Sequence, residues 1–190
     1  VFARPAARSW QRPTSGWAPL DQTWVMGMDP AELWRTQPHL RTVVDFVARN
    51  VAQLGLHAFD RAGDTDRQRV RDGVAEVLRR PNANQTTYEL VYALVADVAL
   101  HDQAFLWVRR DASADSGWEL RPIPAAWVVS SQGGTVFAPA EWVVRPPGAT
   151  SSVAPLVIPA REMLAFHGWN PSDPSTGSSP VAALKLILAE

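Results

Sequence analysis

The stretch RRPNANQTTYELVYALVADVALHDQAFLWVRR, Arg79–Arg110, decides the fold. Pro81 cannot continue a helix, and Asn82 after it favours a turn. Thr86 is a predicted N-cap, because Glu89 stands three residues later and can complete a capping box. The sequence therefore predicts that one helix ends before Pro81 and that another begins at Thr86.

This second helix is predicted to lie in the core. Nearly every residue of Tyr88–Leu100 is apolar, and only Glu89 and Asp97 interrupt the run. A helix that is apolar on all sides is buried in a core or in a membrane. At about 14 residues it is roughly 21 Å long, which is too short to span a bilayer. It is predicted to stop at His101–Gln103, and Phe105–Val108 then favours a buried strand.

The composition excludes several classes of protein. The 18 basic and 19 acidic residues leave a net charge of −1, which does not indicate a nucleic-acid or membrane-surface binder. Without cysteine there is no disulfide framework, thiolate nucleophile or Cys-based zinc site. We find no membrane span and no signal peptide, and with 190 residues we expect one domain with an appended arm. Because the chain opens on Val1 and closes on Glu190 inside a predicted helix, we expect a piece of a longer polypeptide.

Residues 1–35 are predicted to form an irregular N-terminal arm with one short helix. Proline and glycine break any period in residues 1–28, so that part is not predicted to pack as an element. The short helix has Asp29 as N-cap and Pro30 at its first position. Tryptophans spaced along such an arm dock either into their own domain or into a neighbour. The interface candidates are Trp10, Trp17 and Trp24.

The predicted core domain covers residues 36–179 and begins with a long helix from about Pro38 to Leu54. Arg41, Asp45 and Arg49 form a ladder of opposite charges on one face. Gly55 is a predicted stop. The helix is predicted to bury one apolar stripe, made of Leu40, Val43, Val44, Val47, Val51 and Leu54.

The segment between the two long helices is predicted to hold a strand, an acidic loop and a third main helix. The strand covers Leu56–Phe59. The loop Asp60–Asp66 departs from the spacing of a calcium loop, so we assign its carboxylates to a helix N-terminus instead. The helix covers Asp66–Arg80.

After Val108 short β-prone runs alternate with proline and glycine, which predicts a sheet of short, mostly antiparallel strands. Gln132-Gly133-Gly134 is a hairpin-turn candidate, and Ser178 or Ser179 is predicted to cap a C-terminal helix over 180–190 with Pro180 at its first position. The fold class is therefore α+β: an irregular arm, three main helices packed with this sheet, and a helix leading out of the chain. The predicted strands are Trp118–Ile123, Trp127–Ser130, Thr135–Phe137, Glu141–Arg145, Leu156–Ile158 and Glu162–His167.

No catalytic constellation is present in the sequence. We find no nucleophile elbow, phosphate-binding glycine loop or zinc-protease motif, and we predict no catalytic residue, metal site or cofactor. The four histidines are scattered. His101 ends the core helix, where a cationic ring would complement the helix dipole. Asp97 on its apolar helix needs a partner, and we expect an arginine in the core or at a subunit boundary.

An ordered set of landmarks carries a family resemblance. It starts with the striped helix TVVDFVARNVAQLGLHAFDR and the turn VLRRPN, Val77–Asn82. Gln85-Thr86 then precedes the core helix ending Leu100-His101, and later come MLAFH, Met163–His167, and GSSP, Gly177–Pro180. Over about residues 40 to 190 this resembles the N-terminal part of the tailed-bacteriophage portal protein family, of the HK97-like type.

The sequence departs from that family at one position. Members usually carry Gly-Asn-Ala-Tyr or similar after the core helix, whereas this chain has Asp102-Gln103-Ala104-Phe105. Without the glycine, Asp102 or Gln103 must make the turn, and Asp tolerates that conformation better than most residues.

The resemblance implies a function that the residues alone do not. Portal proteins form a dodecameric ring at one capsid vertex, are not enzymes and need no cofactor. The implied partners are other copies of the chain, the major capsid protein, the terminase large subunit, a head–tail adaptor and double-stranded DNA, which passes without sequence-specific contacts. The implied location is the virion, with the host cytoplasm during assembly and no membrane. This chain would supply the wing region.

Two alternatives stay open. The first is a small α+β enzyme or ligand-binding module that uses Asp97, the loop Asp60–Asp66 and a histidine. The second is another capsid or connector component of the same phage.

Overall fold

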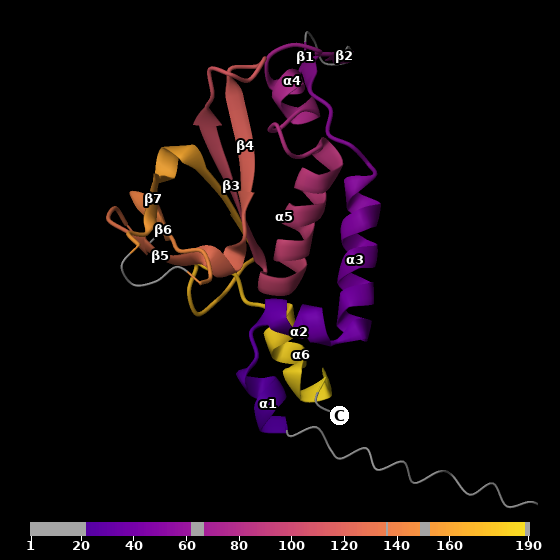
Figure 1. Ribbon diagram of the computed structural model, residues 1–190, viewed down its shortest axis with the longest axis vertical. Coiled ribbons are helices and arrows are strands. Elements are labelled where there is room, and N and C mark those ends of the chain that lie inside the picture. Colours follow the sequence, from indigo (N-terminus) through magenta and orange to yellow (C-terminus); the bar gives the residue numbers. More distant parts are fainter. Residues whose placement is uncertain (1–21, 62–66, 136, 149–152, 189–190) are drawn as a thin grey trace, which may run out of the picture.

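Helix α5 (Thr87–His101) runs through the centre of the molecule, with a helix on one side and a sheet on the other (Figure 1). The helix is α3 (Pro38–Ala52), and the antiparallel sheet has the order β4 (Trp118–Ile123), β3 (Gln103–Arg110) and β8 (Met163–His167). The computed structural model describes residues 22–61, 67–135, 137–148 and 153–188.

The predicted capping box starts α5. The hydroxyl of Thr86 accepts a hydrogen bond from the backbone N–H of Glu89 at 3.3 Å, and the Glu89 carboxylate accepts one from the N–H of Thr86 at 2.8 Å. The bond from the Thr86 N–H, together with one that the Thr86 hydroxyl donates to the same carboxylate at 3.0 Å, lowers the pKa of Glu89. The prediction of a core helix is confirmed, since Leu90, Val91 and Leu100 are buried.

The central sheet presents one face to α5 and the other to a second sheet. Leu106 and Leu120 face the helices and pack in one cluster with Leu90 of α5 and Val77 of the short helix before it. The second sheet has the order β5 (Val128–Gln132), β6 (Glu141–Val144) and β7 (Leu156–Pro159), again antiparallel. A separate core joins the two sheets, formed by Phe105, Ile123, Ala125, Val144, Ile158 and Met163.

The α+β prediction is confirmed, although the strands form two three-stranded sheets and a hairpin instead of one sheet. The hairpin pairs β1 (Phe59–Arg61) with β2 (Arg67–Arg69). The predicted strand at 135–137 is wrong: Thr135 forms only an isolated bridge with Ala138, after two glycines with positive φ, Gly133 and Gly134.

Helix α3 buries a different face from the predicted one. Leu40, Val44, Ala48 and Ala52, spaced four residues apart, are buried against the domain. The small side chains of the two alanines let α3 approach α5 along this row. The other predicted members of the stripe, Val43, Val47, Val51 and Leu54, are exposed.

The predicted helix over Asp66–Arg80 is also wrong. Its first part is strand β2, and only Val74–Arg79 is helical, as α4. Gly73 has φ +56°, which a continuing right-handed helix does not permit, so the helix begins after it. The strand predicted over Leu56–Phe59 lies later, because β1 starts at Phe59.

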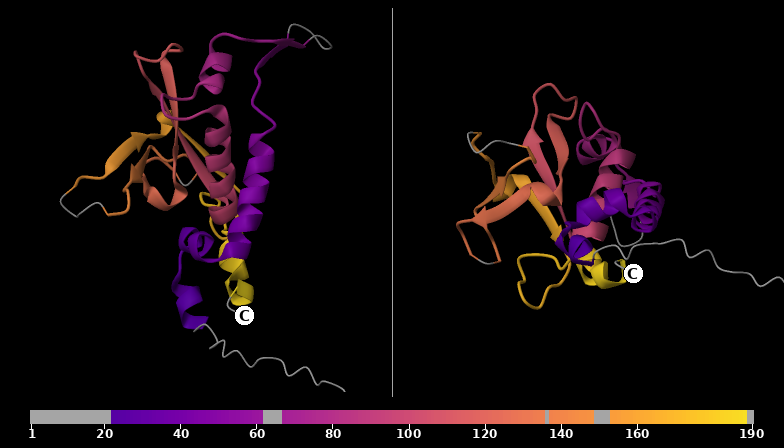
Figure 2. Two further views of the ribbon diagram at one scale, coloured as in Figure 1. Left: turned by 45° about the vertical axis from the view of Figure 1, so that its right-hand side comes forward. Right: turned by 60° about the horizontal axis from the view of Figure 1, so that its bottom comes forward.

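Three short helices close one end of the molecule (Figure 2): α1 (Gln22–Gly27), α2 (Pro30–Thr36) and α6 (Pro180–Leu188). Asp29 caps α2, accepting a hydrogen bond from the N–H of Glu32 at 2.7 Å. The expectation that residues 1–28 do not pack is wrong for the described part. Val25 and Met28 are buried in a cluster that also holds Leu33, Leu40, Val44, Leu100 and Val181.

The carboxylate of Asp45 joins three helices. The predicted ladder is present, with Arg41 and Arg49 each 3.7 Å from it. Asp45 also accepts hydrogen bonds from the Trp34 indole of α2 at 3.1 Å and from the Tyr92 hydroxyl of α5 at 2.8 Å.

Among the described residues, no helix is long and apolar enough to cross a membrane.

Candidate functional site

Asp102 makes the turn between α5 and β3. Its φ of +58° and ψ of +21° are left-handed, and it is the non-glycine residue with positive φ in the described part of the chain. Its N–H donates to the carbonyl of Val98 at 2.8 Å, which closes the helix. The prediction that Asp102 or Gln103 replaces a glycine here is thus confirmed at Asp102.

The same residue binds a loop that arrives from the other end of the sequence. The backbone carbonyl of Asp102 accepts a hydrogen bond from the N–H of Gly168 at 2.9 Å, directly after β8. Its carboxylate accepts one from the N–H of Ser178 at 3.0 Å, directly before α6. Both ends of the loop 168–178 are therefore attached to one residue.

Two glycines allow this approach. A Cβ on Gly168 would overlap the carboxylate of Asp102, and a Cβ on Gly177 would overlap its backbone carbonyl. Neither glycine has positive φ, so the requirement comes from space and not from backbone conformation. Sequence reasoning used Gly177 only as a landmark and did not assign a role to Gly168.

Helix α6 starts from this contact of Asp102 with Gly168 and Ser178, here called the Asp102 junction. The hydroxyl of Ser179 accepts a hydrogen bond from the N–H of Ala182 at 3.1 Å, and it donates to the carbonyl of Leu100 on α5 at 2.5 Å. The predicted cap is thus Ser179, with Pro180 at the first helical position. Further along, the ammonium of Lys185 donates to the carbonyl of Met26 on α1 at 3.0 Å.

The junction acts mechanically. The hydrogen bond that the Asp102 carboxylate accepts and the one that the Ser179 hydroxyl donates, together with the buried side chain of Val181, fix the direction in which α6 leaves the domain. No nucleophile with a positioned base is formed by these groups, and their chemistry is that of a rigid connection.

The turn before α5 makes a similar connection at the other end of that helix. The side-chain amide of Asn82 donates to the carbonyl of Leu120 on β4 and to the side chain of Gln85, both at 2.9 Å. The N–H of Leu120 donates back to the carbonyl of Pro81 at 2.7 Å. The Arg-Pro-Asn turn therefore docks α5 onto the sheet.

The family model described as phage portal protein matches residues 38–190. The chain belongs to the phage portal protein family. The match begins at the first residue of α3 and includes α5, both sheets, the Asp102 junction and α6.

Solved structures share the fold of this portal family chain. It is similar to a chain in the neck of an empty gene transfer agent (GTA) particle computed with C6 symmetry, with a TM-score of 0.66, 19% identity and coverage of 85% of this chain and 43% of the other. It is also similar to a chain in the virion of a native GTA particle, with a TM-score of 0.62, 17% identity and coverage of 90% of this chain and 42% of the other. A third similar chain lies in the neck of a native GTA particle computed with C12 symmetry, with a TM-score of 0.60, 19% identity and coverage of 85% of this chain and 41% of the other.

This portal family chain therefore spans less than half the length of the solved chains it matches. Comparison with curated proteins gives no match.

Asp97 has a different partner in the portal chain from the one we expected. Its carboxylate accepts a hydrogen bond from the backbone N–H of Ala125 at 3.0 Å, at the entry to the second sheet. No arginine pairs with it within the described residues, so the prediction of a core arginine is wrong for that part of the chain. Burial raises the pKa of Asp97 to about 6, and the Ala125 bond opposes this rise.

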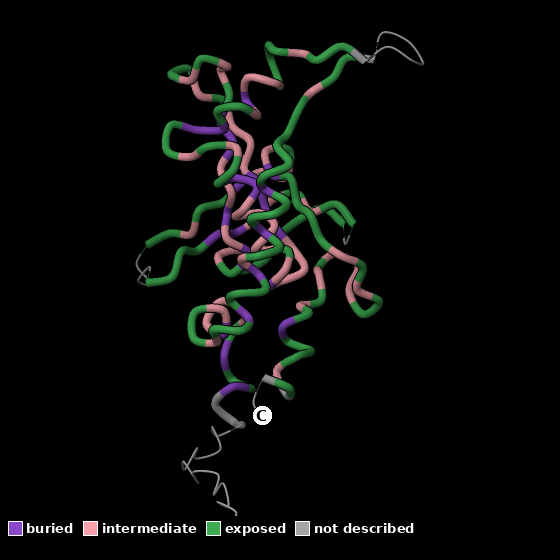
Figure 3. Tube along the Cα trace, turned by 90° about the vertical axis from the view of Figure 1, so that its right-hand side faces the viewer, coloured by how far each residue is buried: buried purple, intermediate pink, exposed green. Residues whose placement is uncertain are grey.

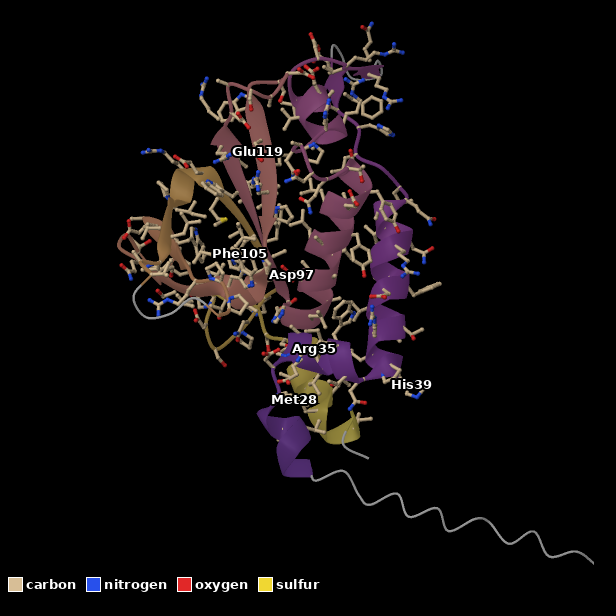
Figure 4. The ribbon with its side chains drawn as sticks, viewed as in Figure 1. Met28, Arg35, His39, Asp97, Phe105 and Glu119 are labelled. Atoms are coloured by element: carbon tan, nitrogen blue, oxygen red, sulfur yellow. The ribbon has the colours of Figure 1, made fainter. Side chains whose placement is uncertain are left out.

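The residues of the enzyme alternative are not brought together. Asp97 lies in the second half of α5, whereas the β1–β2 hairpin with Asp60 lies beyond its other end, and His39 points away from the domain (Figures 1 and 4). Burial lowers the pKa of His101, which disfavours a cationic ring at the end of the core helix. In the described ranges no three His, Asp or Glu side chains are placed to hold a metal ion.

The three interface candidates give an incomplete picture. Trp10 and Trp17 lie outside the described residues, and Trp24 belongs to α1 but its side chain is not described. Loop residues 62–66, which include Asp64 and Asp66, also lie outside them.

Proposed function

We propose that this chain is part of a portal subunit that assembles with further copies into a ring, twelve in number, at one vertex of a phage-type capsid. Double-stranded DNA would be packaged and ejected through the ring, and the tail would attach to it. The family match over residues 38–190 carries the proposal. The similar solved chains support it, since they belong to the neck or the virion of gene transfer agent particles, and the necks have C12 or C6 symmetry.

The partners follow from this role. They are the major capsid protein, the terminase large subunit and a head–tail adaptor, in the virion and during assembly in the host cytoplasm. The subunit itself would be structural and non-enzymatic. The residues 36–179 would form the wing-like domain, and α6 would lead into the next part of the polypeptide.

DNA would pass without being held. Arginines near the end of the β3–β4 hairpin are paired with acids: Arg109 and Arg121 both contact the buried carboxylate of Glu119, and Arg80 lies 3.9 Å from Asp115. A cleft of about 400 Å³ beside them is lined by acids and arginines together. Paired arginines are poor phosphate ligands, so this surface favours DNA passage over DNA binding.

The tryptophans of the arm would dock on a neighbouring subunit. Deleting residues 1–21 tests this idea better than deleting residues 1–28, because Val25 and Met28 belong to the subunit's own core. We expect the deletion to reduce the ring population on native mass spectrometry. An unchanged ring population would rule out the arm as a staple between subunits.

Negative-stain electron microscopy of the full-length protein tests the proposed function. Rings with an open centre and about twelve subunits in end-on views are expected. A stable monomer or dimer at all salt and protein concentrations would contradict it. A thermal-shift screen with divalent metal ions tests the ligand-binding alternative. A ligand at 100 times its Kd raises the free energy of unfolding by about 2.7 kcal/mol.

A further inference from the structure

One face of α3 is apolar and has no partner in the described structure. Four side chains of α3 and one in the turn directly after it, here called the α3 stripe, are 38% to 77% exposed: Val43, Phe46, Val47, Val51 and Leu54. In Figure 3 this flank of the molecule faces the viewer. Scattered exposed apolar residues are ordinary, but these five follow the helical repeat from the first half of α3 to the turn after it.

The polar side chains around the α3 stripe are bonded to other groups. Asn50 lies between its members, and its side-chain amide donates to the backbone carbonyl of Phe46 at 2.7 Å. The charged residues of α3, Arg41, Asp45 and Arg49, lie along the neighbouring side and pair with one another. An apolar centre beside a row of paired charges is the arrangement found in protein–protein interfaces.

The apolar surface continues beyond the helix. Leu56 is 45% exposed and Phe59, at the start of β1, is 55% exposed. The β1–β2 hairpin that carries Phe59 projects from the rest of the domain (Figure 2). Because an isolated two-stranded hairpin is only marginally stable in water, contact with a surface outside this domain would stabilise it.

The size of this surface also fits a protein–protein interface. With Leu56 and Phe59 the seven side chains expose on the order of 600 Å² of apolar surface, which reaches the upper end of what monomeric proteins expose in one patch. A standard interface buries about 800 Å² on each partner. The α3 stripe with its extension would thus form most of one side of such an interface.

We propose that the α3 stripe, with Leu56 and Phe59, is the surface on which a neighbouring copy of this chain packs in the ring; this inference rests on the proposed function. In a ring each subunit meets its two neighbours through two different surfaces. The α3 stripe lies on one flank of the domain, and the lobe formed by β5, β6 and β7 lies on the opposite flank (Figure 1). The stripe of one copy therefore faces the opposite flank of the next copy and not another stripe.

Photo-crosslinking of the full-length protein tests this assignment. Benzoylphenylalanine is placed at Phe46, which is 68% exposed, and as a matched control at Trp169, which is 80% exposed on the loop after β8. After irradiation of purified rings, we expect a band of twice the subunit mass from position 46 and at most a trace from position 169. A crosslink within one chain, no crosslink, or equal dimer bands from both positions would overturn the assignment.

A charge on the stripe gives the second readout. Val47→Glu is expected to lower the ring fraction on native mass spectrometry by about tenfold or more, as for the loss of a buried apolar contact. Gln53→Glu, at the exposed polar residue that directly follows this helix, should leave the ring fraction unchanged. Circular dichroism must show both variants folded.

The outcomes separate the two proposals. If the wild type forms rings and the Val47→Glu variant forms the same fraction of rings, the role of the α3 stripe is overturned and the proposed function stays intact. A wild-type protein that forms no ring would overturn the proposed function, and the inference with it.

Discussion

The carboxylate of Asp102 lies 3.0 Å from the backbone nitrogen of Ser178, 76 positions later in the chain. The first residue ends the core helix, and the second precedes the helix that leaves the domain. Asp102 adopts a left-handed conformation that costs a non-glycine residue about 1–2 kcal/mol. The hydrogen bond to Ser178 offsets that cost, which explains why aspartate can stand where a glycine would turn more easily.

Substitutions at Asp102 separate the turn from the link. Asp102→Ala removes the charged hydrogen bond and keeps the left-handed strain, so we expect a loss of about 2–3 kcal/mol in the free energy of unfolding. Asp102→Gly loses the bond but relieves the strain and should cost about 1 kcal/mol. Urea unfolding measures both. An alanine variant as stable as the wild type would show that the link to Ser178 does not stabilise the domain.

Gly177 is expected to be the more sensitive glycine of the junction. Gly177→Ala places a methyl group into the backbone carbonyl of Asp102, and the backbone cannot turn away as a side chain can. We expect a loss of about 2 kcal/mol or more, in the range of overpacked cores. Gly27→Ala is the control, because nothing lies within 4 Å of the added Cβ. Equal melting temperatures of the two variants would contradict the predicted overlap.

The sequence predicts best where local chemistry determines the structure. The capping box at Thr86, the N-cap at Asp29 and the cap at Ser179 each need only a few neighbouring residues, and all three are present. The turn at Asp102 was predicted in the same way, from the residues that replace a glycine. Its bonds to Gly168 and Ser178 were not, because contacts over such separations depend on the path of the whole chain.

The errors concern partners that a sequence does not specify. Both rows of α3 are apolar, and the choice of the row of Leu40, Val44 and Ala48 was decided by α5 and not by periodicity. The same holds for Asp97, whose partner is a backbone N–H supplied by a turn 28 positions away. The predicted helix over residues 66–80 failed at Gly73, whose positive φ the helical pattern did not reveal.

Asn82 is expected to hold the turn before α5 against β4. Asn82→Ala removes hydrogen bonds to Leu120 and Gln85 from a residue that is only 8% exposed, and it leaves the Leu120 carbonyl without this donor. We expect a loss of about 2–3 kcal/mol in the free energy of unfolding. Asn84→Ala, in the same turn but exposed, should change it by no more than about 0.5 kcal/mol. Chemical unfolding of both variants checks this, and similar losses would show that the turn and not the side-chain bonds matters.

Asp97 is expected to make the stability of the domain depend on pH. Its pKa of about 6 in the folded state lies above the ordinary value of 3.8, so the folded chain binds more protons than the unfolded chain between pH 4 and pH 6. The contribution of Asp97 is therefore fully present below about pH 4, falls as the pH rises through 6, and stays low above it.

Asp97→Asn removes this dependence while its side-chain oxygen can still accept the hydrogen bond from Ala125. At pH 4 we expect the variant and the wild type to have similar free energies of unfolding. At pH 7.5 the variant should be more stable by about 1–3 kcal/mol, since one pKa unit corresponds to about 1.4 kcal/mol. Urea unfolding at the two pH values measures the difference. A variant that loses stability equally at both pH values would contradict the prediction, because ionising Asp97 would then carry no cost in the folded wild type.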